Sequence, residues 1–454
     1  MRPGAPSGFG AFKGKEDAMR SRRGRMLLVG VGLWLALMVP ALVLAEGPEQ
    51  AKAGQAVTAA DSGPAGFDPV AATEAYLAKL SSEQRARSDA YFEGGYWLQL
   101  WGFLYGAAVA ILLLATRLSA RMRNLAVRIT RAPIPQTALY WVQYLVAATV
   151  LSFPLTVYQG FIREHKYGLA TQTFGPWLGD QAKGLAIGAV LGGLALMAIY
   201  AVIRRAPRTW WLWGAGVSVV FMVFAIVIGP VFIEPVFNKY TSLTDEKVKG
   251  PILRLARANG IPATDVFVFD ASRQTTRVSA NVAGFLGTER IALNDNLLKR
   301  CSLPEIETVM AHEMGHYVLN HISKFLLQIG LLIVAGFAFV RWAFDRVAAR
   351  WGPRWGIRGI ADVAGLPLLV LLLSIFFFVM TPVTNTMIRT QEVEADIFGL
   401  NAARQPDGEA EVALKLGEYR KLKPGPVEEF VFFDHPSGYS RILMAMRWKA
   451  ENLR

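Results

Sequence analysis

Three of the chain's five histidines lie in one short stretch, "VMAHEMGHYVLNH", which runs from Val309 to His321. Within it, His312, Glu313 and His316 form the pattern H-E-x-x-H. Positions i and i+4 of a helix face the same way, so both imidazoles can reach one metal ion. Glu313 lies one step round the helix, where it can take a proton from a water molecule. The pattern predicts a hydrolytic zinc site, and the competing interpretation is a helix with two incidental histidines.

A catalytic zinc ion needs a third protein ligand and one open position. His321 lies five residues after His316, and on a continuous helix that spacing turns it about 140° away. The longer metzincin pattern also fails, because Leu319 and Ile322 stand where it requires Gly and His. We therefore expect His321 to lie at an interface or to support a ligand, and not to bind the metal itself.

A carboxylate from another helix is the expected third ligand. The segment "RTQEVEADIFGLNAA" offers Glu392 and Asp396 at positions i and i+4, on one face. One of them can bind the metal while the other accepts an N–H from a ligating histidine. Glu394 lies about 200° round from Glu392 and is expected to face away. The competing interpretation is a solvated cluster of charges beside a membrane.

The composition is that of a membrane protein. Hydrophobic residues make up 53% of the 454 residues, charged residues only 18%, and the mean hydropathy is +0.31. A soluble domain usually carries about 25% charged residues. The net charge of +13 comes from short basic clusters between apolar runs, so we expect membrane lipid and no nucleic acid as a partner. Cys301 is the single cysteine, which excludes an intramolecular disulfide and a cysteine-rich zinc site.

Apolar runs long enough to cross a hydrocarbon core as helices recur along the chain, and they predict about seven transmembrane helices. They are residues 26–45, 96–115, 137–158, 184–203, 210–233, 325–344 and 361–384. The first run is either a cleaved signal peptide or a retained anchor. Because a signal core usually spans only about 7–15 residues, its length favours an anchor.

The loops predict the orientation of these helices. Loops rich in arginine alternate with loops that are not, and the arginine-rich ones are 116–136, 204–209 and 345–360. The positive-inside rule places such loops in the cytoplasm. By alternation, residues 234–324 and 385–454 lie together on the other side.

These features divide the chain into six parts. They are a basic N-terminus with the signal or anchor (1–45), a polar extracytoplasmic segment (46–95), transmembrane helices (96–233), a catalytic insert with H-E-x-x-H (234–324), a transmembrane hairpin (325–384) and a C-terminal catalytic part with the third zinc ligand (385–454).

The insert has a mixed secondary structure. Residues 244–260 predict a helix that Gly260 ends, and "DVFVFDAS" and "RIALND" predict short strands. A further helix begins at Ser302, where Ser302 and Glu305 fit a capping box. We expect this helix to carry the histidine pair and to continue into the apolar run at 325.

With these motifs the chain resembles the integral-membrane zinc endopeptidases of the CAAX prenyl protease type 1 family and their bacterial relatives. The similarity runs from about Arg85 to Arg441. Its pieces are "REHKYGLATQTFGPWLGDQAKG", "FIEPVFNKYTSL", "VFVFDASRQTTRVSANVAGFLGTERIALNDNLL", "HEMGH", "RTQEVEAD" and "DHPSGYSR". The resemblance implies an all-α polytopic membrane protein, with about seven transmembrane helices enclosing a chamber and a small α+β gluzincin-type zinc catalytic domain.

The resemblance also assigns residues. It implies that Glu392 is the third ligand of one Zn²⁺ per chain and that Asp396 supports a ligating histidine. His435, before Pro436, is implied to hold the substrate carbonyl or its developing oxyanion, and Arg441 follows at the family spacing.

The chain departs from the family pattern at two places. Where relatives often have Asn-Ala, this chain has Ser279-Ala280, followed by Asn281, in the segment implied to bind the substrate as an added strand. A serine usually precedes Arg389, and here the residue is Ile388. The first departure affects the expected substrate contacts and leaves the zinc chemistry untouched.

The expected activity is zinc-dependent endopeptidase hydrolysis of membrane or envelope proteins, with Glu313 as the general base and His435 beside the oxyanion. The expected place is a bacterial inner membrane with the active site on the periplasmic side. Prenylation is a cytosolic modification, so the predicted orientation disfavours the alternative, a CAAX prenyl protease acting on prenylated C-termini. A minor alternative is a transporter or an inactive protease-like scaffold.

Overall fold

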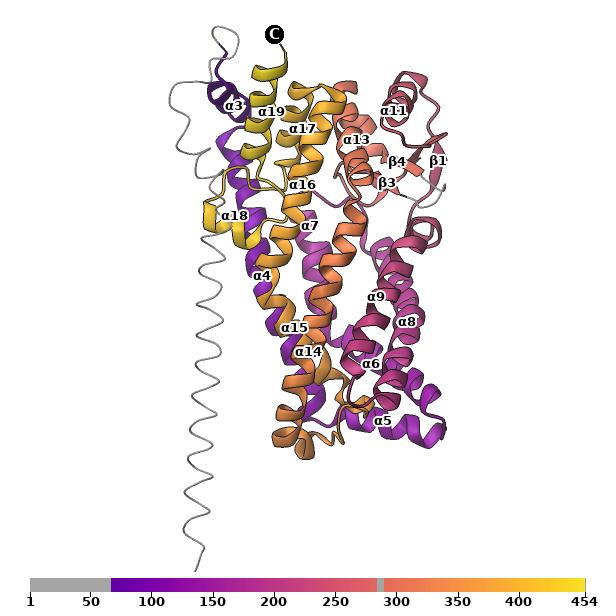
Figure 1. Cartoon of the computed structure of the whole chain (residues 1–454). Coiled ribbons are helices and arrows are strands. Elements are labelled where there is room, and N and C mark those ends of the chain that lie inside the picture. The colour runs from indigo at the N-terminus through magenta and orange to yellow at the C-terminus, as the bar shows by residue number, and fades with distance from the viewer. Residues whose placement is uncertain (1–66, 284–289, 454) are drawn as a thin grey trace, which may run out of the picture. The chain divides into compact units, whose positions relative to one another are not determined.

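The structure, a computed structural model, describes residues 67–283 and 290–453. Nearly all of these residues belong to one unit, Pro69–Arg454. In this unit long helices run side by side, and most of the shorter helices gather with one small sheet at one end, while α5 (Leu118–Ile129) lies at the other (Figure 1). The expected first apolar helix, 26–45, lies outside the described residues.

Five helical segments are long and apolar enough to cross a membrane. They are α4 (Ser82–Ala115), α6 (Pro133–Val157) with η1 (Tyr158–Ile162) and α7 (Arg163–Lys166), α8 (Phe174–Arg205), α9 (Trp210–Ile228) with η2 (Gly229–Ile233) and α10 (Glu234–Phe237), and α14 (His321–Trp355). A sixth candidate joins η4 (Val363–Gly365) and α15 (Leu366–Val379) to α16 (Thr381–Ala403) across a 56° bend. Each apolar run expected between residues 96 and 384 falls in one of these six, and the expected polytopic helical fold is confirmed.

The long helices share one apolar core. It includes the fully buried side chains of Tyr140, Tyr200, Trp210 and Phe344. Because lipid tails are as apolar as these side chains, close van der Waals packing between the helices, rather than removal of apolar surface from water, holds them together. The core therefore forms from the helices themselves, without the sheet.

Buried polar contacts secure the end of the bundle that lies away from the sheet (Figure 1). There α5 (Leu118–Ile129) presents Ser119, whose hydroxyl lies 2.7 Å from the Tyr140 hydroxyl and donates to the Ala364 carbonyl. Arg123 forms a buried ion pair with Asp362. The arginine-rich segment 116–136 is thus held against α6 and against the segment around Asp362.

The sheet has four short strands in the order β1-β2-β4-β3. They are β1 (Tyr240–Ser242), β2 (Val266–Phe269), β3 (Ala280–Ala283) and β4 (Arg290–Asn294). β2 and β4 are parallel, and the other two pairs are antiparallel. The two strands expected from the insert's sequence are confirmed as β2 and β4, and β3 forms an edge of the sheet in the segment that the resemblance implied to pair with the substrate.

Short helices cover this sheet and share its apolar core. They are α11 (Glu246–Ala258), α12 (Asp295–Arg300) and α13 (Leu303–Val318), while η3 (Ala271–Arg273) follows β2 outside this core. Gly260, at a φ of +71°, follows α11 as expected, since only glycine adopts this backbone readily. The predicted capping box is also present: Ser302 precedes α13, and its N–H donates to the Glu305 carboxylate.

The helix that carries the histidine pair does not continue into the membrane, so this expectation is wrong. α13 ends at Val318, and Asn320 takes a left-handed conformation with a φ of +57°. Asparagine tolerates this conformation better than most residues. α14 then begins at His321 in a new direction, which changes where His321 points.

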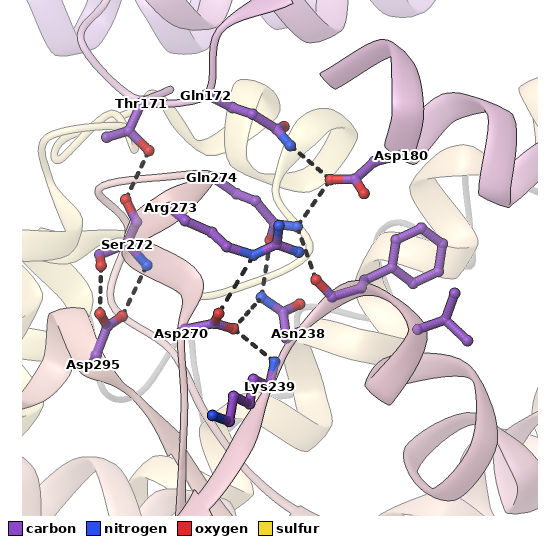
Figure 2. Close-up of polar contacts among 12 residues, drawn as sticks. Thr171, Gln172, Asp180, Asn238, Lys239, Asp270, Ser272, Arg273, Gln274 and Asp295 are labelled. Carbon is purple, nitrogen blue, oxygen red and sulfur yellow. Dashed lines mark hydrogen bonds and ion pairs between the residues drawn. The ribbon is translucent and has the colours of Figure 1, made fainter. Parts of the chain in front are cut away.

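A polar network joins the sheet to the membrane helices (Figure 2). Asp180, on α8, accepts hydrogen bonds from Gln172 Nε2 at 2.7 Å and from Gln274 Nε2 at 3.1 Å. The Thr171 N–H donates to the Gln274 carbonyl at 3.1 Å, and its hydroxyl donates to the Ser272 carbonyl at 2.8 Å. The loop before α8 therefore holds the segment that leads from η3 into β3.

Four helices near the chain ends complete the unit beside the sheet: α3 (Pro69–Leu77), α17 (Pro406–Leu416), α18 (Pro426–Phe432) and α19 (Gly438–Asn452). α19 packs on both α17 and α3. Lys415 of α17 forms an ion pair of 2.6 Å with Glu305 at the start of α13. Segments far apart in sequence thus meet around α13 (Figure 1).

Candidate metal centre

Three potential metal ligands converge between α13 and α16. His312 Nε2 and His316 Nε2 are 3.1 Å apart. Glu392 brings Oε2 to 3.3 Å from His312 Nε2 and Oε1 to 3.4 Å from His316 Nε2. Within the described residues these are the three that could hold a metal ion together.

The donor set and its spacing fit zinc. Two imidazole nitrogens and one carboxylate are a common ligand set of hydrolytic zinc sites, with a fourth position left open. Ligand atoms at about 2.0–2.2 Å from a tetrahedral ion lie roughly 3.3 Å from one another. The measured separations of 3.1, 3.3 and 3.4 Å match this value.

Close packing of α13 on α16 makes this convergence possible. A Cβ atom added at Gly399 would lie 3.2 Å from the backbone nitrogen of His312. A Cβ atom added at Gly315 would lie 3.3 Å from the Cα atom of Ala395. Glycine on each helix therefore lets the two backbones approach until Glu392 reaches the histidine pair.

His312 is held from behind by a second acid. Its Nδ1 lies 2.8 Å from Asp396 Oδ1, so the ring nitrogen donates to the carboxylate and Nε2 is left free for a metal. Asp396 is 1% exposed and is itself held by Arg441, whose Nε and Nη2 donate to it at 2.9 and 2.7 Å. Arg441 Nη2 also lies 3.4 Å from Glu392 Oε2. Arg441 thus fixes both acids while also lining the cleft, where a substrate contact stays a prediction.

His316 is held from behind by a histidine. Because the chain turns at Asn320, His321 Nδ1 lies 2.9 Å from His316 Nδ1. His321 Nε2 lies 3.0 Å from Glu394 Oε2. With Nε2 of His316 free for a metal, His316 Nδ1–H donates to His321, and His321 Nε2–H donates to Glu394. His321 thus supports a proposed ligand, as one of the two expected roles had it, but the expectation that it turns away from His316 is wrong because the helix breaks between α13 and α14.

Glu313 lines the same cleft as the three potential ligands. Burial raises its pKa to about 7, and the neighbouring His312 opposes that shift. A carboxyl group with a pKa near neutrality can both accept and return a proton during one reaction cycle. Although burial disfavours a charged imidazole, the hydrogen bonds to Asp396 and Glu392 raise the pKa of His312 to about 10.

His435 reaches the cleft from the turn between α18 and α19. Its Nε2 lies 3.3 Å from Glu392 Oε2, and its Nδ1 lies 2.8 Å from Asp434 Oδ1. The preceding turn is anchored to α16, because Arg389 donates to the Phe433 carbonyl at 2.6 Å. The same helix therefore positions both Glu392 and His435.

The edge strand β3 borders the cleft. Ser279 and Ala280 line it, whereas Asn281 does not. In the described part of the chain, β3 pairs on one side only, with β4. Its other edge is open to an added strand, as the resemblance implied.

Two cleft residues were missed by reasoning from the sequence. Glu409, on α17, is 5% exposed, and burial raises the pKa of its carboxyl group. Arg420 lies in the loop after α17. Neither belongs to a recognisable motif, and no spacing in the sequence singles them out.

Two family profiles match the chain. The one described as "CAAX prenyl protease N-terminal, five membrane helices" covers residues 70–239, and "Peptidase family M48" covers residues 242–449. The "Uncharacterized metalloprotease YhfN" of Bacillus subtilis is 31% identical over 296 residues, which are 65% of this chain and 69% of that protein.

Other relatives are more distant. "CAAX prenyl protease 1" of Saccharomyces cerevisiae is 30% identical over 261 residues, and the match spans 55% of this chain but only 57% of that protein. The crystal structure of S. mikatae Ste24p is similar in fold, with a TM-score of 0.68 and 22% identity, over 83% of this chain and 95% of that one.

Proposed function

Because the chain belongs to peptidase family M48 and is a membrane metalloendopeptidase, we propose that His312, His316 and Glu392 hold one Zn²⁺. The observation that carries the proposal is the convergence of these three side chains, with separations of 3.1 to 3.4 Å, beside the buried Glu313. Zn²⁺ bound there would polarise the scissile carbonyl and lower the pKa of water.

The protein's own residues supply the proton transfers. Glu313 takes a proton from the attacking water and later delivers it to the leaving amine, which its pKa of about 7 permits. His435, oriented by Asp434, donates a hydrogen bond to the carbonyl oxygen as negative charge develops. Asp396 and His321 keep the two ligating imidazoles in place.

The substrate is proposed to bind extended along β3. Ser279 and Ala280 border the cleft, so the backbone of a peptide paired with β3 would pass the proposed ligands. Asn281 is on the same strand and takes part in its pairing with β4. Ser279, Ala280 and Asn281 are therefore the proposed substrate-binding residues, and they would contact the peptide through main-chain hydrogen bonds.

Replacing Glu313 by Gln tests the reaction. The variant should keep its metal, because Glu313 is not one of the three converging ligands, and it should lose hydrolysis of casein-type peptides. Zinc content by atomic absorption and peptide release are measured on the same preparation. Undiminished hydrolysis would exclude Glu313 as the base, and a wild-type protein that holds zinc without hydrolysing any peptide would favour the transporter or scaffold alternative.

The side of the membrane is proposed from the loops. The arginine-rich loops lie at the end of the bundle opposite α13 and the sheet (Figure 1). The positive-inside rule then supports a cytoplasmic location for those loops and a periplasmic one for the centre, in a bacterial inner membrane. Alkaline phosphatase fused to the C-terminus should be active, and a fluorescent cytoplasmic signal from a fused green fluorescent protein would contradict the proposal.

The same orientation bears on the substrate. A periplasmic centre favours membrane or envelope proteins as substrates, with lipid as the surrounding partner. Several relatives are called CAAX prenyl proteases, so cleavage of prenylated C-termini is the second candidate. Matched peptides with and without a prenyl group distinguish the two, because only the second candidate requires the lipid.

A further inference from the structure

Two cavities meet beside the proposed centre. The catalytic cleft, of ≈ 180 Å³, is lined by the proposed ligands and by β3. A second cavity, of ≈ 410 Å³, extends along α4 and is also lined by residues of α16 and α18. Tyr419 and Arg420, in the loop between α17 and α18, line both. A peptide that extends from the cleft into the second cavity must pass this pair.

Arg420 is an unpaired cation at this junction. Among residues 67–283 and 290–453, its guanidinium has no hydrogen-bond acceptor and no carboxylate within 4.0 Å. The other two arginines that line the second cavity are paired: Arg277 lies 2.7 Å and Arg163 lies 3.7 Å from the Glu164 carboxylate. Burial lowers the pKa of Arg420, and the nearby Arg441 cation adds to this shift.

The backbone that carries Arg420 is fixed. The buried hydroxyl of Ser88, on α4, contacts the Arg420 carbonyl at 3.0 Å and also the Gly417 carbonyl. Folding therefore holds a partly buried cation at the junction that no carboxylate contacts directly, although Asp434 and Glu392 act on it over a longer distance. A carboxylate from outside would complete this site by pairing with the guanidinium.

We propose that Arg420 is a specificity-determining residue that binds a carboxylate of the substrate at the junction of the two cavities. The planar guanidinium can donate two parallel hydrogen bonds to the two oxygens of a carboxylate. A peptide offers this group in two places, on an acidic side chain and at its C-terminus. The proposal rests on the proposed peptidase function, because it assigns the substrate chemistry of the same cleft.

A peptide matrix tests it. Peptides with Glu or Gln at each position near the scissile bond, each with a free or an amidated C-terminus, are hydrolysed by the wild type and by R420Q and R420K. We expect R420Q to lower kcat/KM roughly 10- to 100-fold for peptides with the recognised carboxylate, mainly through KM, and to leave neutral peptides unchanged. R420K should retain part of the preference. A preference that follows Glu identifies a side chain, and one that follows the free C-terminus identifies the terminal carboxylate.

Two results would overturn the proposal: an equal loss by R420Q on charged and neutral peptides, or no loss on any peptide. The matched control is Arg254→Gln, which removes the same charge from an exposed position on α11 and should leave every value unchanged. Thermal midpoints and zinc contents of R420Q and the wild type identify a folding defect.

Binding to the zinc-loaded E313Q protein separates this proposal from the peptidase function. Fluorescence anisotropy of labelled peptides should show the same carboxylate preference, and E313Q/R420Q should lose it. If the wild type cleaves nothing while this preference persists, the peptidase function fails and the role of Arg420 stands. If cleavage is normal and no preference is seen in either assay, the role of Arg420 is excluded.

Discussion

At the scale of single residues, the two imidazoles of the proposed centre are supported differently. His312 Nδ1 faces the carboxylate of Asp396, whereas His316 Nδ1 faces His321 Nδ1. The other ring nitrogen of His321 in turn contacts the Glu394 carboxylate. Groups behind metal ligands fix the ring orientation and the position of the imidazole proton. The two ligating imidazoles are therefore oriented by chemically different groups, a carboxylate and an imidazole.

Replacing His321 by Ala should weaken zinc binding about 10- to 100-fold, because the His316 ring loses the acceptor that orients it. Zinc affinity is measured by competition with a chelating dye, beside the thermal midpoint of the metal-free protein. His321→Asn should recover part of the affinity, since its amide oxygen can take the place of Nδ1. The control is His165→Ala, outside the centre, and an H321A protein with wild-type zinc affinity would exclude the supporting role.

Zinc binding should depend on pH through His312. Its pKa is raised to about 10, so at pH 7 the metal-free protein carries a proton there that zinc must displace. The pKa of His316 is lowered to about 4 by burial and by His312, so His316 releases none. Affinity should rise about tenfold per pH unit between neutrality and pH 10.

Calorimetry in two buffers of different ionisation enthalpy counts the released protons. Asp396→Asn removes the main carboxylate that holds the proton on His312 and should reduce the number released at pH 7. A binding enthalpy that is independent of the buffer would contradict this assignment.

At the scale of elements, the approach of α13 to α16 limits the centre. A Cβ atom at Gly399 would press against the His312 backbone at 3.2 Å, so Gly399→Ala must separate the two helices by a few tenths of an ångström. We expect a destabilisation of about 1–3 kcal/mol and a lower zinc affinity. Gly106→Ala on α4, where an added Cβ meets no atom within 4 Å, is the matched control. Equal thermal midpoints and zinc affinities in the two variants would show that the approach is not limiting.

The helices also show which parts of the fold and of the proposed site the sequence predicts. Apolar runs of about 20 residues form helices in a bilayer because every backbone polar group must be paired there, so the expected runs between 96 and 344 lie in long helices and the run 361–384 lies in the bent pair of α15 and α16. The H-E-x-x-H pair and the acidic pair at i, i+4 carry their geometry in their spacing, so their convergence was predictable.

The features that the sequence did not predict depend on the backbone conformation of single residues and on tertiary packing. The left-handed Asn320 reverses the position of His321, and no periodic pattern marks such a break. Arg420 lies in a loop, and its lack of a partner emerges only when helices far apart in sequence close around it. Neither property is encoded in a local run of residue types.

At the scale of the whole molecule, the membrane core is separate from the proposed centre. The bundle core contains none of the three potential ligands, and the sheet has a core of its own. Chelation should therefore abolish hydrolysis while the helical circular dichroism is retained. At zinc concentrations about 1,000 times the Kd, metal binding adds about 4 kcal/mol, so the thermal midpoint should rise on zinc addition. Loss of helicity on chelation would contradict the independence of the bundle.

A bend of 56° between α15 and α16 couples the tilt of α16 to the position of the proposed centre. α16 carries Glu392 at its middle and meets the apolar helix α15 at its first residue, while α13 meets α14 at Asn320. From Thr381 to Glu392 the arm is ~17 Å long, so a tilt of ~5° at the bend would move the carboxylate by ~1.5 Å, half the spacing between neighbouring ligands. A change in the thickness or lateral tension of the surrounding lipid that tilts α16 would therefore change the distance from Glu392 to the two histidines.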